Sequence, residues 1–273
     1  MIMAKPGERV VVYASTRNQY DKMETAAKSL LLNNIIDKVY FLTEDEDYPN
    51  YLPSCITAIN VEPIVENYFN KDGPNFNSDW SYMTLLRLTL YDLFPEHNTV
   101  LYLDTDTLVI NDISELFDID LTEYYCAGVP DECIGRVDMH VLKKDLGPDP
   151  YALLVRTPYV FGDYYNAGVM LLNLRALRDG TGKNMIRMIN TEPLQFKDQD
   201  AINISCRNKI LRLPSDYNAA PMTAGTTNPK ILHLSKANNV YNKSLWLSYE
   251  SMSWPWIEKQ MEINRKKQME AKE

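Results

Sequence analysis

The run from Val100 to Ile110 constrains the fold more than any other part of the chain. Apolar side chains lead up to the acidic pair Asp104 and Asp106 and resume directly after it. An apolar run that is rich in Val, Leu and Tyr predicts a buried strand of an α/β sheet. Because side chains alternate along a strand, we expect the two carboxylates to point the same way, at or near the end of that strand.

The acidic pair predicts a cation site. A carboxylate without a partner is costly to remove from water, so both side chains need a counter-charge. Carboxylate oxygens are the ligands that hard divalent cations prefer. The competing interpretation is a turn at the end of the strand, in which the aspartates accept hydrogen bonds from backbone N–H groups. The apolar surroundings favour the cation site.

Length and charge limit the classes of function. A chain of 273 residues can form one large domain or two small ones with a sizeable core. The net charge of −9 argues against nucleic-acid or anionic-membrane partners, because binding to phosphate-covered surfaces requires surplus Lys and Arg. A divalent cation still allows a small phosphate-bearing substrate to enter an acidic pocket.

The cysteines and the first residues predict a cytoplasmic protein. Four cysteines without a C-x-x-C spacing indicate reduced, mostly buried thiols: Cys55, Cys126, Cys133 and Cys206. Residues 1–9 lack the layout of a signal peptide, and the apolar run 10–14 is too short to span a membrane. We therefore expect residues 9–15 to form the first strand and the chain to have no transmembrane segment.

Strands and helices alternate in the first third of the chain. Strands are predicted at 9–15, 39–43 and 56–61, with a helix over 21–32. This order implies a largely parallel sheet with a ligand crevice at the carboxyl ends of its strands. Thr16 and Asn18 follow the first strand, where they could bond to a nucleotide, although turn chemistry is the simpler explanation for these two residues alone.

A helix is predicted over 80–94, with Arg87 among its apolar residues. A surface arginine is the default interpretation, but one that faces the crevice could clamp phosphate. A further strand over 125–130 leads to Asp131. Residues 135–160 have little pattern and are expected to form an irregular excursion with an acceptor-side or lid role.

The second half adds three polar positions. In the strand over 164–174, Asn166 precedes two small residues that let a ligand approach the backbone. Asp198 opens a helix, where capping by the helix dipole is the simpler explanation. His233 ends a strand over 230–234, and such a histidine is more often structural than a ligand.

Residues 242–273 hold an aromatic segment and a helix of balanced charge, which favours a solvated helix over peripheral membrane contact.

The ordered motifs resemble the family 8 retaining glycosyltransferases, which include bacterial lipooligosaccharide galactosyl- and glucosyltransferases and glycogenin. The resemblance covers residues 9 to about 234. It rests on V-x-Y-A-S-T-x-N, an R-L-x-L helix, L-Y-L-D-T-D-T-L-V, Y-N-A-G-V-M-L-L-N-L, K-D-Q-D-A-I-N and a late strand that ends in His. Each motif is weak alone, but together and in this order they are strong.

This resemblance implies a GT-A fold, with a Rossmann-like, mostly parallel central sheet flanked by helices. Residues 1–241 would form the catalytic domain and residues 242–273 a C-terminal extension. The cofactor would be Mn²⁺ (or Mg²⁺), bound by Asp104, Asp106 and His233 and bridging the two phosphates of a UDP-hexose. Donor contacts would come from Ala14, Thr16, Asn18, Tyr20, Arg87, Thr105, Ala167 and Lys236. The catalytic and sugar-pocket residues would be Gln199, Asp198, Asp131, Asn166 and Arg87.

The chain departs from the family pattern after His233. The family usually shows H-x-x-G-x-x-K-P-W, whereas here Lys236 stands at the Gly position and Asn239 at the Lys position. The lysine that would cover the diphosphate is therefore missing from its usual place. Lys236 and Lys243 are the candidates from the sequence for supplying that charge.

The resemblance implies hexose transfer to a sugar, glycan or protein-linked acceptor hydroxyl with retention of the anomeric configuration. Because Gln199 is a poor nucleophile, we expect front-face transfer rather than double displacement. Two alternatives stay open. One is a non-catalytic protein that binds nucleotide sugars or acts as a scaffold. The other is a phosphatase of the haloacid-dehalogenase type, although its motif requires Thr where Leu108 stands.

Overall fold

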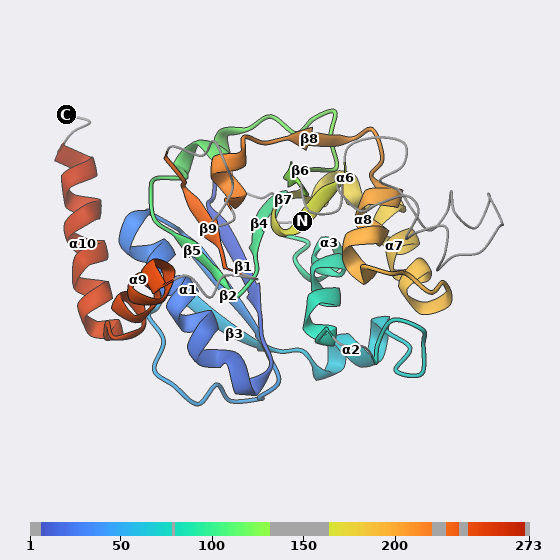
Figure 1. Ribbon diagram of the computed structural model, residues 1–273, viewed down its shortest axis with the longest axis horizontal. Helices are drawn as coiled ribbons and strands as arrows, with labels where there is room; N and C mark the ends of the chain where they lie inside the picture. The colour runs from blue at the N-terminus through green and yellow to red at the C-terminus, as the bar shows by residue number, and fades with distance from the viewer. Residues whose placement is uncertain (1–6, 78–79, 132–163, 220–227, 235–239, 271–273) are drawn as a thin grey trace.

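The protein is built around a seven-stranded sheet with helices on both faces (Figure 1). The computed structural model describes residues 7–77, 80–131, 164–219, 228–234 and 240–270. The sheet has the order β3-β2-β1-β4-β7-β6-β8. Its strands are β1 (Val10–Ala14), β2 (Lys38–Thr43), β3 (Ile56–Asn60), β4 (Thr99–Leu103), β6 (Cys126–Pro130), β7 (Tyr165–Asn173) and β8 (Ile210–Arg212).

The expected largely parallel sheet is confirmed. Strands β1 to β4 are parallel to one another, and β6 is parallel to β8. Strand β7 pairs antiparallel with both β4 and β6. A separate two-stranded sheet pairs β5 (Thr107–Val109) with β9 (Ile231–His233) in antiparallel fashion. The polar ends of β1, β4 and β7 consequently meet beside this second sheet.

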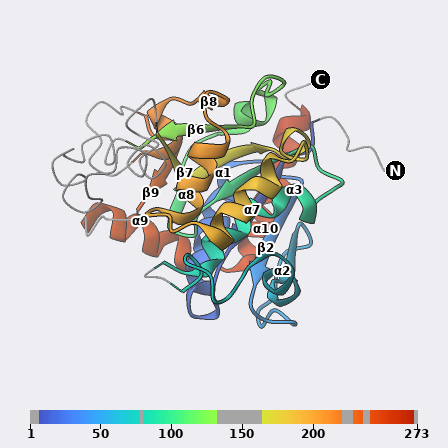
Figure 2. The same cartoon turned by 90° about the vertical axis from the view of Figure 1, so that its right-hand side faces the viewer.

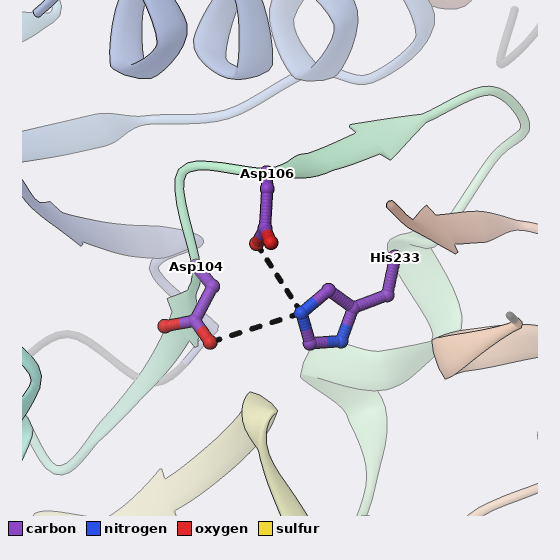
Figure 3. A group of neighbouring side chains, drawn as sticks. All are labelled: Asp104, Asp106 and His233. Carbon is purple, nitrogen blue, oxygen red and sulfur yellow. Dashed lines mark ion pairs between the residues drawn. The ribbon is translucent and has the colours of Figure 1, made fainter. Parts of the chain in front are cut away.

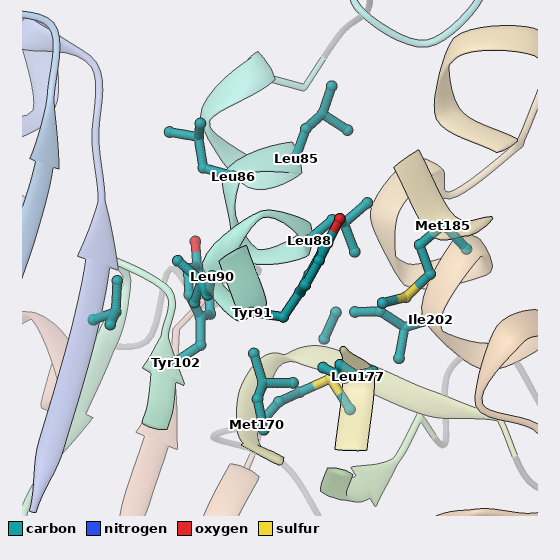
Figure 4. Packing of buried hydrophobic residues seen from close by; sticks show 14 of the residues in the cluster. Leu85, Leu86, Leu88, Leu90, Tyr91, Tyr102, Met170, Leu177, Met185 and Ile202 are labelled. Carbon is teal, nitrogen blue, oxygen red and sulfur yellow. The ribbon is translucent and has the colours of Figure 1, made fainter. Parts of the chain in front are cut away.

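Alternation along the strands divides the core into two layers. In β1, Val10 and Val12 face one layer, while Val11 and Tyr13 face the other. The first layer packs against α3 (Leu90–Leu93), α6 (Leu174–Leu177), α7 (Thr181–Thr191) and α8 (Lys197–Ser205) (Figures 2 and 4). The second packs against α1 (Tyr20–Asn33) and α10 (Trp254–Glu270), with α9 (Val240–Glu250) also beside α1. The remaining helices of the described residues are α2 (Glu62–Tyr68), η1 (Arg17–Gln19), η2 (Tyr82–Leu88), η3 (Ser114–Asp118) and η6 (Ser215–Asn218).

The acidic pair lies in a turn, and this corrects the expectation of one continuous strand over 100–110. The chain leaves β4 after Leu103 and enters β5 in the other sheet at Thr107. The turn closes where Thr107 N and Thr107 Oγ1 donate to Asp104 O at 3.2 and 2.7 Å. Strand alternation therefore does not explain why the two carboxylates lie together.

The helix expected over 80–94 is also different. It divides into the 3-10 helix η2 and the short α3, with Thr89 between them. The Ser81 hydroxyl caps η2 by accepting a hydrogen bond from Met83 N at 3.2 Å. Arg87 consequently points inward, because a 3-10 turn places side chains at a different angle from an α-helix.

The cysteines of the described residues are free, as expected. Cys126 and Cys206 are buried free thiols and Cys55 is a half-buried one, whereas Cys133 lies outside the described residues. The excursion expected over 135–160 also lies outside them. Among the described helices, none has the length and apolar character needed to cross a membrane.

Candidate active site

Asp104, Asp106 and His233 form a compact group beside the ends of β4 and β9 (Figure 3). The pairing of Thr107 with His233 in the small sheet brings the imidazole next to the turn. His233 Nε2 lies 3.2 Å from Asp106 Oδ1 and 3.9 Å from Asp104 Oδ2. One ligand atom from each residue lies within 4.8 Å of the other two, so a single cation can reach all three.

The charges of this group are coupled. Burial acts to lower the pKa of His233, but its hydrogen bond to Asp106 and the two nearby carboxylates outweigh burial and raise it. Burial acts to raise the pKa of Asp106, and the same imidazole reverses this and lowers it. A proton on His233 and a cation therefore compete for the same carboxylates.

Asn218 orients the histidine ring from behind. Its Oδ1 lies 2.9 Å from His233 Nδ1, and its Nδ2 donates to Asn166 Oδ1 at 2.8 Å. Because Oδ1 is an acceptor, Nδ1 carries a proton, and Nε2 donates to the Asp106 carboxylate. Loss of the Nε2 proton would leave a lone pair on Nε2 that a cation could use. Sequence reasoning missed Asn218, which resembles any polar residue at the start of a loop.

Gly168 allows Asp104 and His233 to approach each other. A Cβ atom at this position would lie 2.3 Å from His233 Cε1 and 2.7 Å from Asp104 Oδ2. The backbone of Gly168 also holds the turn, since its carbonyl accepts from Asp104 N at 2.8 Å. The small residue at position 168 thus leaves room for the side chains of Asp104 and His233.

Arg87 lies inside the protein, with only 3% of its surface exposed. Its Nη2 pairs with Asp104 at 2.8 Å and its Nε pairs with Asp198 at 3.0 Å. Its Nη1 donates to Ala167 O, and the guanidinium lies 4.2 Å from the centroid of the Tyr102 ring. Every nitrogen of Arg87 therefore has a protein partner, and its contact with a substrate phosphate stays a prediction.

Asp198 is the most perturbed carboxyl group of the site. Burial raises its pKa to about 6 against the opposing charge of Arg87, and the nearby Asp104 adds to the increase. The carboxylate is held by Arg87 rather than by the first turn of α8 alone. The capping explanation for this residue is therefore insufficient.

Gln199, Asn166 and Asp131 form a hydrogen-bonded group at the start of α8 and the ends of β6 and β7. Gln199 Oε1 accepts from Ala167 N at 2.9 Å and from Asn166 Nδ2 at 3.3 Å. Asp131 Oδ2 accepts from Asn166 Nδ2 at 3.2 Å and from Gln199 Nε2 at 3.3 Å. The group presents amide and carboxylate oxygens, which suit the hydroxyls of a sugar.

A cleft of about 470 Å³ brings most of these residues together. This volume lies within the usual range for small-molecule sites, which is about 300–1,000 Å³. The predicted residues that line it are Ala14, Thr16, Arg87, Asp104, Thr105, Asp106, Asp131, Asn166, Ala167, Asp198, Gln199 and His233. Lining residues that sequence reasoning did not select include Ser15, Gln19, Lys22, Trp80 and Phe196.

Three residues that the sequence predicted to contact the sugar donor are not among the described residues that line the cleft. Asn18 is outside the cleft lining but accepts a hydrogen bond from the lining residue Thr16 at 2.6 Å. Tyr20 is buried, and its hydroxyl accepts a hydrogen bond from Glu44 N at 2.9 Å, so it supports the fold beside the cleft. Lys236 lies outside the described residues.

Residues 10–243 match the family model described as Glycosyl transferase family 8. The chain belongs to this family. Membership of this family favours glycosyl transfer and sets the phosphatase alternative aside. The cleft is the candidate active site of a family 8 enzyme.

Relatives and solved structures agree with this assignment. The chain is 24% identical to a probable glycosyl transferase Gly of Streptococcus gordonii, over 97% of this chain and 38% of that protein. It is 27% identical to a lipopolysaccharide 1,2-glucosyltransferase of Escherichia coli K12, over 65% of this chain and 50% of that protein. The chain thus spans half or less of the length of these two curated relatives.

The fold is GT-A. The galactosyltransferase LgtC in complex with donor and acceptor sugar analogs superposes with a TM-score of 0.68 and 20% identity, over 91% of this chain and 99% of that one. The bifunctional glycosyltransferase WbbM superposes with the same TM-score at 17% identity, over 94% of this chain and 52% of that one. At these sequence identities, both structural similarities show a shared fold alone.

Proposed function

We propose that this family 8 enzyme moves a hexose, glucose or galactose, from a UDP-sugar to an acceptor hydroxyl with retention, in the synthesis of a glycan or cell-surface polysaccharide. The acceptor would be a sugar, a glycan or a protein-linked group. The observation that carries the proposal is the group of Asp104, Asp106 and His233 in the same cleft as Asp131, Asn166 and Gln199. A cytoplasmic location stays a prediction from the cysteines.

The donor atoms of the group fit a divalent cation. Two carboxylate oxygens suit Mg²⁺ and Mn²⁺, and an imidazole nitrogen favours a transition metal, so Mn²⁺ is the better match. The space that Gly168 leaves and the proton position that Asn218 imposes both support this use of His233. When bound, the cation would neutralise charge on the UDP leaving group.

The sugar-side residues support front-face transfer. Gln199 Oε1 is already held by the Ala167 N–H, and an amide oxygen is a poor nucleophile. The Asp198 carboxylate lines the cleft, but it is buried and paired with Arg87, which makes it a poor nucleophile. Asp131 is held by two amides and would accept hydrogen bonds from the sugar hydroxyls.

UDP release tests the proposal directly. The purified protein would be incubated with UDP-glucose or UDP-galactose and Mn²⁺, with and without EDTA. We expect Asp104→Ala and Asp106→Ala to reduce UDP release by at least about 100-fold, because a bound metal contributes several kcal/mol of transition-state stabilisation. Asp112→Ala is the matched control, since Asp112 is exposed and outside the cleft lining.

Two results would change the interpretation. Undiminished turnover in EDTA and in both aspartate variants would contradict a metal-dependent site. Binding of UDP-sugars with Mn²⁺ but without turnover, tested across candidate acceptors, would favour the non-catalytic alternative.

A further inference from the structure

The charge balance of the cleft matters for the proposed UDP-sugar donor, on which this inference rests. The diphosphate of a UDP-sugar is an anion, and its charge increases as the sugar leaves. Four carboxylates line the cleft already, from Asp104, Asp106, Asp131 and Asp198. Arg87 offsets Asp104 and Asp198. A metal would still have to offset the other two carboxylates and the phosphates together, so a further cation near the acidic pair would reduce the excess of negative charge.

Of the expected sources of this charge, Lys236 lies outside the described residues, and the others do not supply it. Asn239 replaces the lysine of the family pattern. Lys243 is exposed on α9 and is not a lining residue of the cleft. Arg87 lines the cleft, but its nitrogens are bound by Asp104, Asp198 and backbone carbonyls. Within the described residues, the side-chain ammonium groups that line the cleft are those of Lys22 and Lys197.

Lys22 extends from the first turn of α1, which packs against β5. A hydrogen bond from Val109 N to Ser29 Oγ at 2.9 Å fixes the position of β5 along the axis of α1. Lys22 precedes Ser29 by two helical turns, about 10 Å along the axis. Asp106 precedes Val109 by about 10 Å of extended chain. Both segments lead back to the cleft, whose lining includes Lys22 and Asp106.

Lys197 is less suited to this role. It is the first residue of α8, beside Asp198, and its charge acts on Asp200. It therefore lies at the part of the cleft that Gln199 and Asp131 share. Lys22 is exposed and forms no ion pair within 4.0 Å with any described residue, so its ammonium is available to a ligand.

We propose that Lys22 binds the diphosphate of the UDP-sugar beside the Asp104–Asp106 turn and balances the charge of the departing UDP. It would take the role that the family usually gives to the lysine after the site histidine. The cation would thus come from α1, the first α-helix of the fold.

Calorimetric titration with UDP in the presence of Mn²⁺ tests this assignment. Lys22→Ala should weaken UDP binding by at least about tenfold, because hydrogen bonds to charged groups are the stronger ones. Uridine, which lacks phosphate, should bind equally to the variant and the original protein. The dependence of UDP affinity on NaCl concentration should also become weaker, since one charge pair is removed. Lys22→Arg should retain most of the UDP affinity.

Lys183→Ala is the matched control. Lys183 is also exposed and is the third residue of α7, as Lys22 is the third residue of α1, but it does not line the cleft. This variant should bind UDP as the original protein does. An unchanged Tm for both alanine variants would show that their folds are intact.

The outcomes separate this inference from the proposed function. If the original protein binds UDP and Lys22→Ala binds it equally well, the role of Lys22 is wrong and the UDP-sugar donor stands. An equal loss of UDP and uridine affinity would also overturn it, because Lys22 would then shape the nucleoside pocket. If the original protein binds no UDP with Mn²⁺, the donor assignment fails and the role of Lys22 fails with it.

Discussion

At the scale of single residues, Gly168 controls how closely two cation-site side chains can meet. In Gly168→Ala, the new Cβ would overlap His233 Cε1 at 2.3 Å and force the ring away from Asp104. We expect Mn²⁺ affinity to fall by at least about tenfold, because the ligand atoms no longer converge. Titration with Mn²⁺, followed by isothermal calorimetry, measures this loss.

Gly182→Ala provides the control for that substitution. A Cβ at position 182 would overlap the Tyr91 ring at 2.4 Å, which is a clash of the same severity in the core (Figure 4). This variant should lose stability, by about 1–3 kcal/mol, and keep the Mn²⁺ affinity of the original protein once folded. Equal Mn²⁺ affinity in Gly168→Ala and the original protein would contradict the role given to Gly168.

Asn218 offers a second test at the residue scale. Removing its side chain in Asn218→Ala frees His233 Nδ1 and also releases Asn166. Partners of this kind typically contribute 10- to 100-fold to metal affinity, so we expect a loss within about that range. Asn173→Ala is the comparison, because its amide bonds only to backbone carbonyls and N–H groups away from the cleft. If both variants bound Mn²⁺ as the original protein does, Asn218 would have no orienting role.

At the scale of elements, Arg87 joins the turn after β4 to the start of α8. Arg87→Ala would leave Asp104 and Asp198 without their counter-charge, and breaking a buried pair costs about 3–5 kcal/mol. We expect a loss of that size in the free energy of unfolding, measured with urea. Arg187→Ala removes an exposed pair with Glu192 and should cost about 0–1 kcal/mol. Similar losses in the two variants would mean that Arg87 does not stabilise this junction.

The sequence predicted which elements carry the site but not how some of them are arranged. The β-α-β order and the apolar runs identified the sheet, since buried parallel strands require such runs. Periodicity could not reveal that the chain changes sheets between Leu103 and Thr107, because both flanking segments are equally apolar. It also could not show that Arg87 faces inward, because its partner Asp198 is far away in the sequence.

At the scale of the whole molecule, α10 completes the core layer that α1 begins. Trp254, Ile257 and Met261 are buried in that layer, and Trp254 Nε1 donates to Glu24 Oε2 at 3.0 Å. The proposed boundary at residue 242 therefore separates segments that share apolar contacts. These contacts lead us to expect that the catalytic domain and the C-terminal extension unfold as one unit.

Ile257→Ala tests that expectation, because Ile257 is a fully buried residue of α10. Truncating a core isoleucine to alanine costs about 2–5 kcal/mol. If α10 belongs to the cooperative unit, circular dichroism and tryptophan fluorescence should report the same single transition, shifted to lower urea concentration. Met269→Ala is the control, since Met269 is 69% exposed and its loss should leave the midpoint unchanged. An early loss of helix signal while the main transition stays in place would instead make residues 242–273 a separate unit.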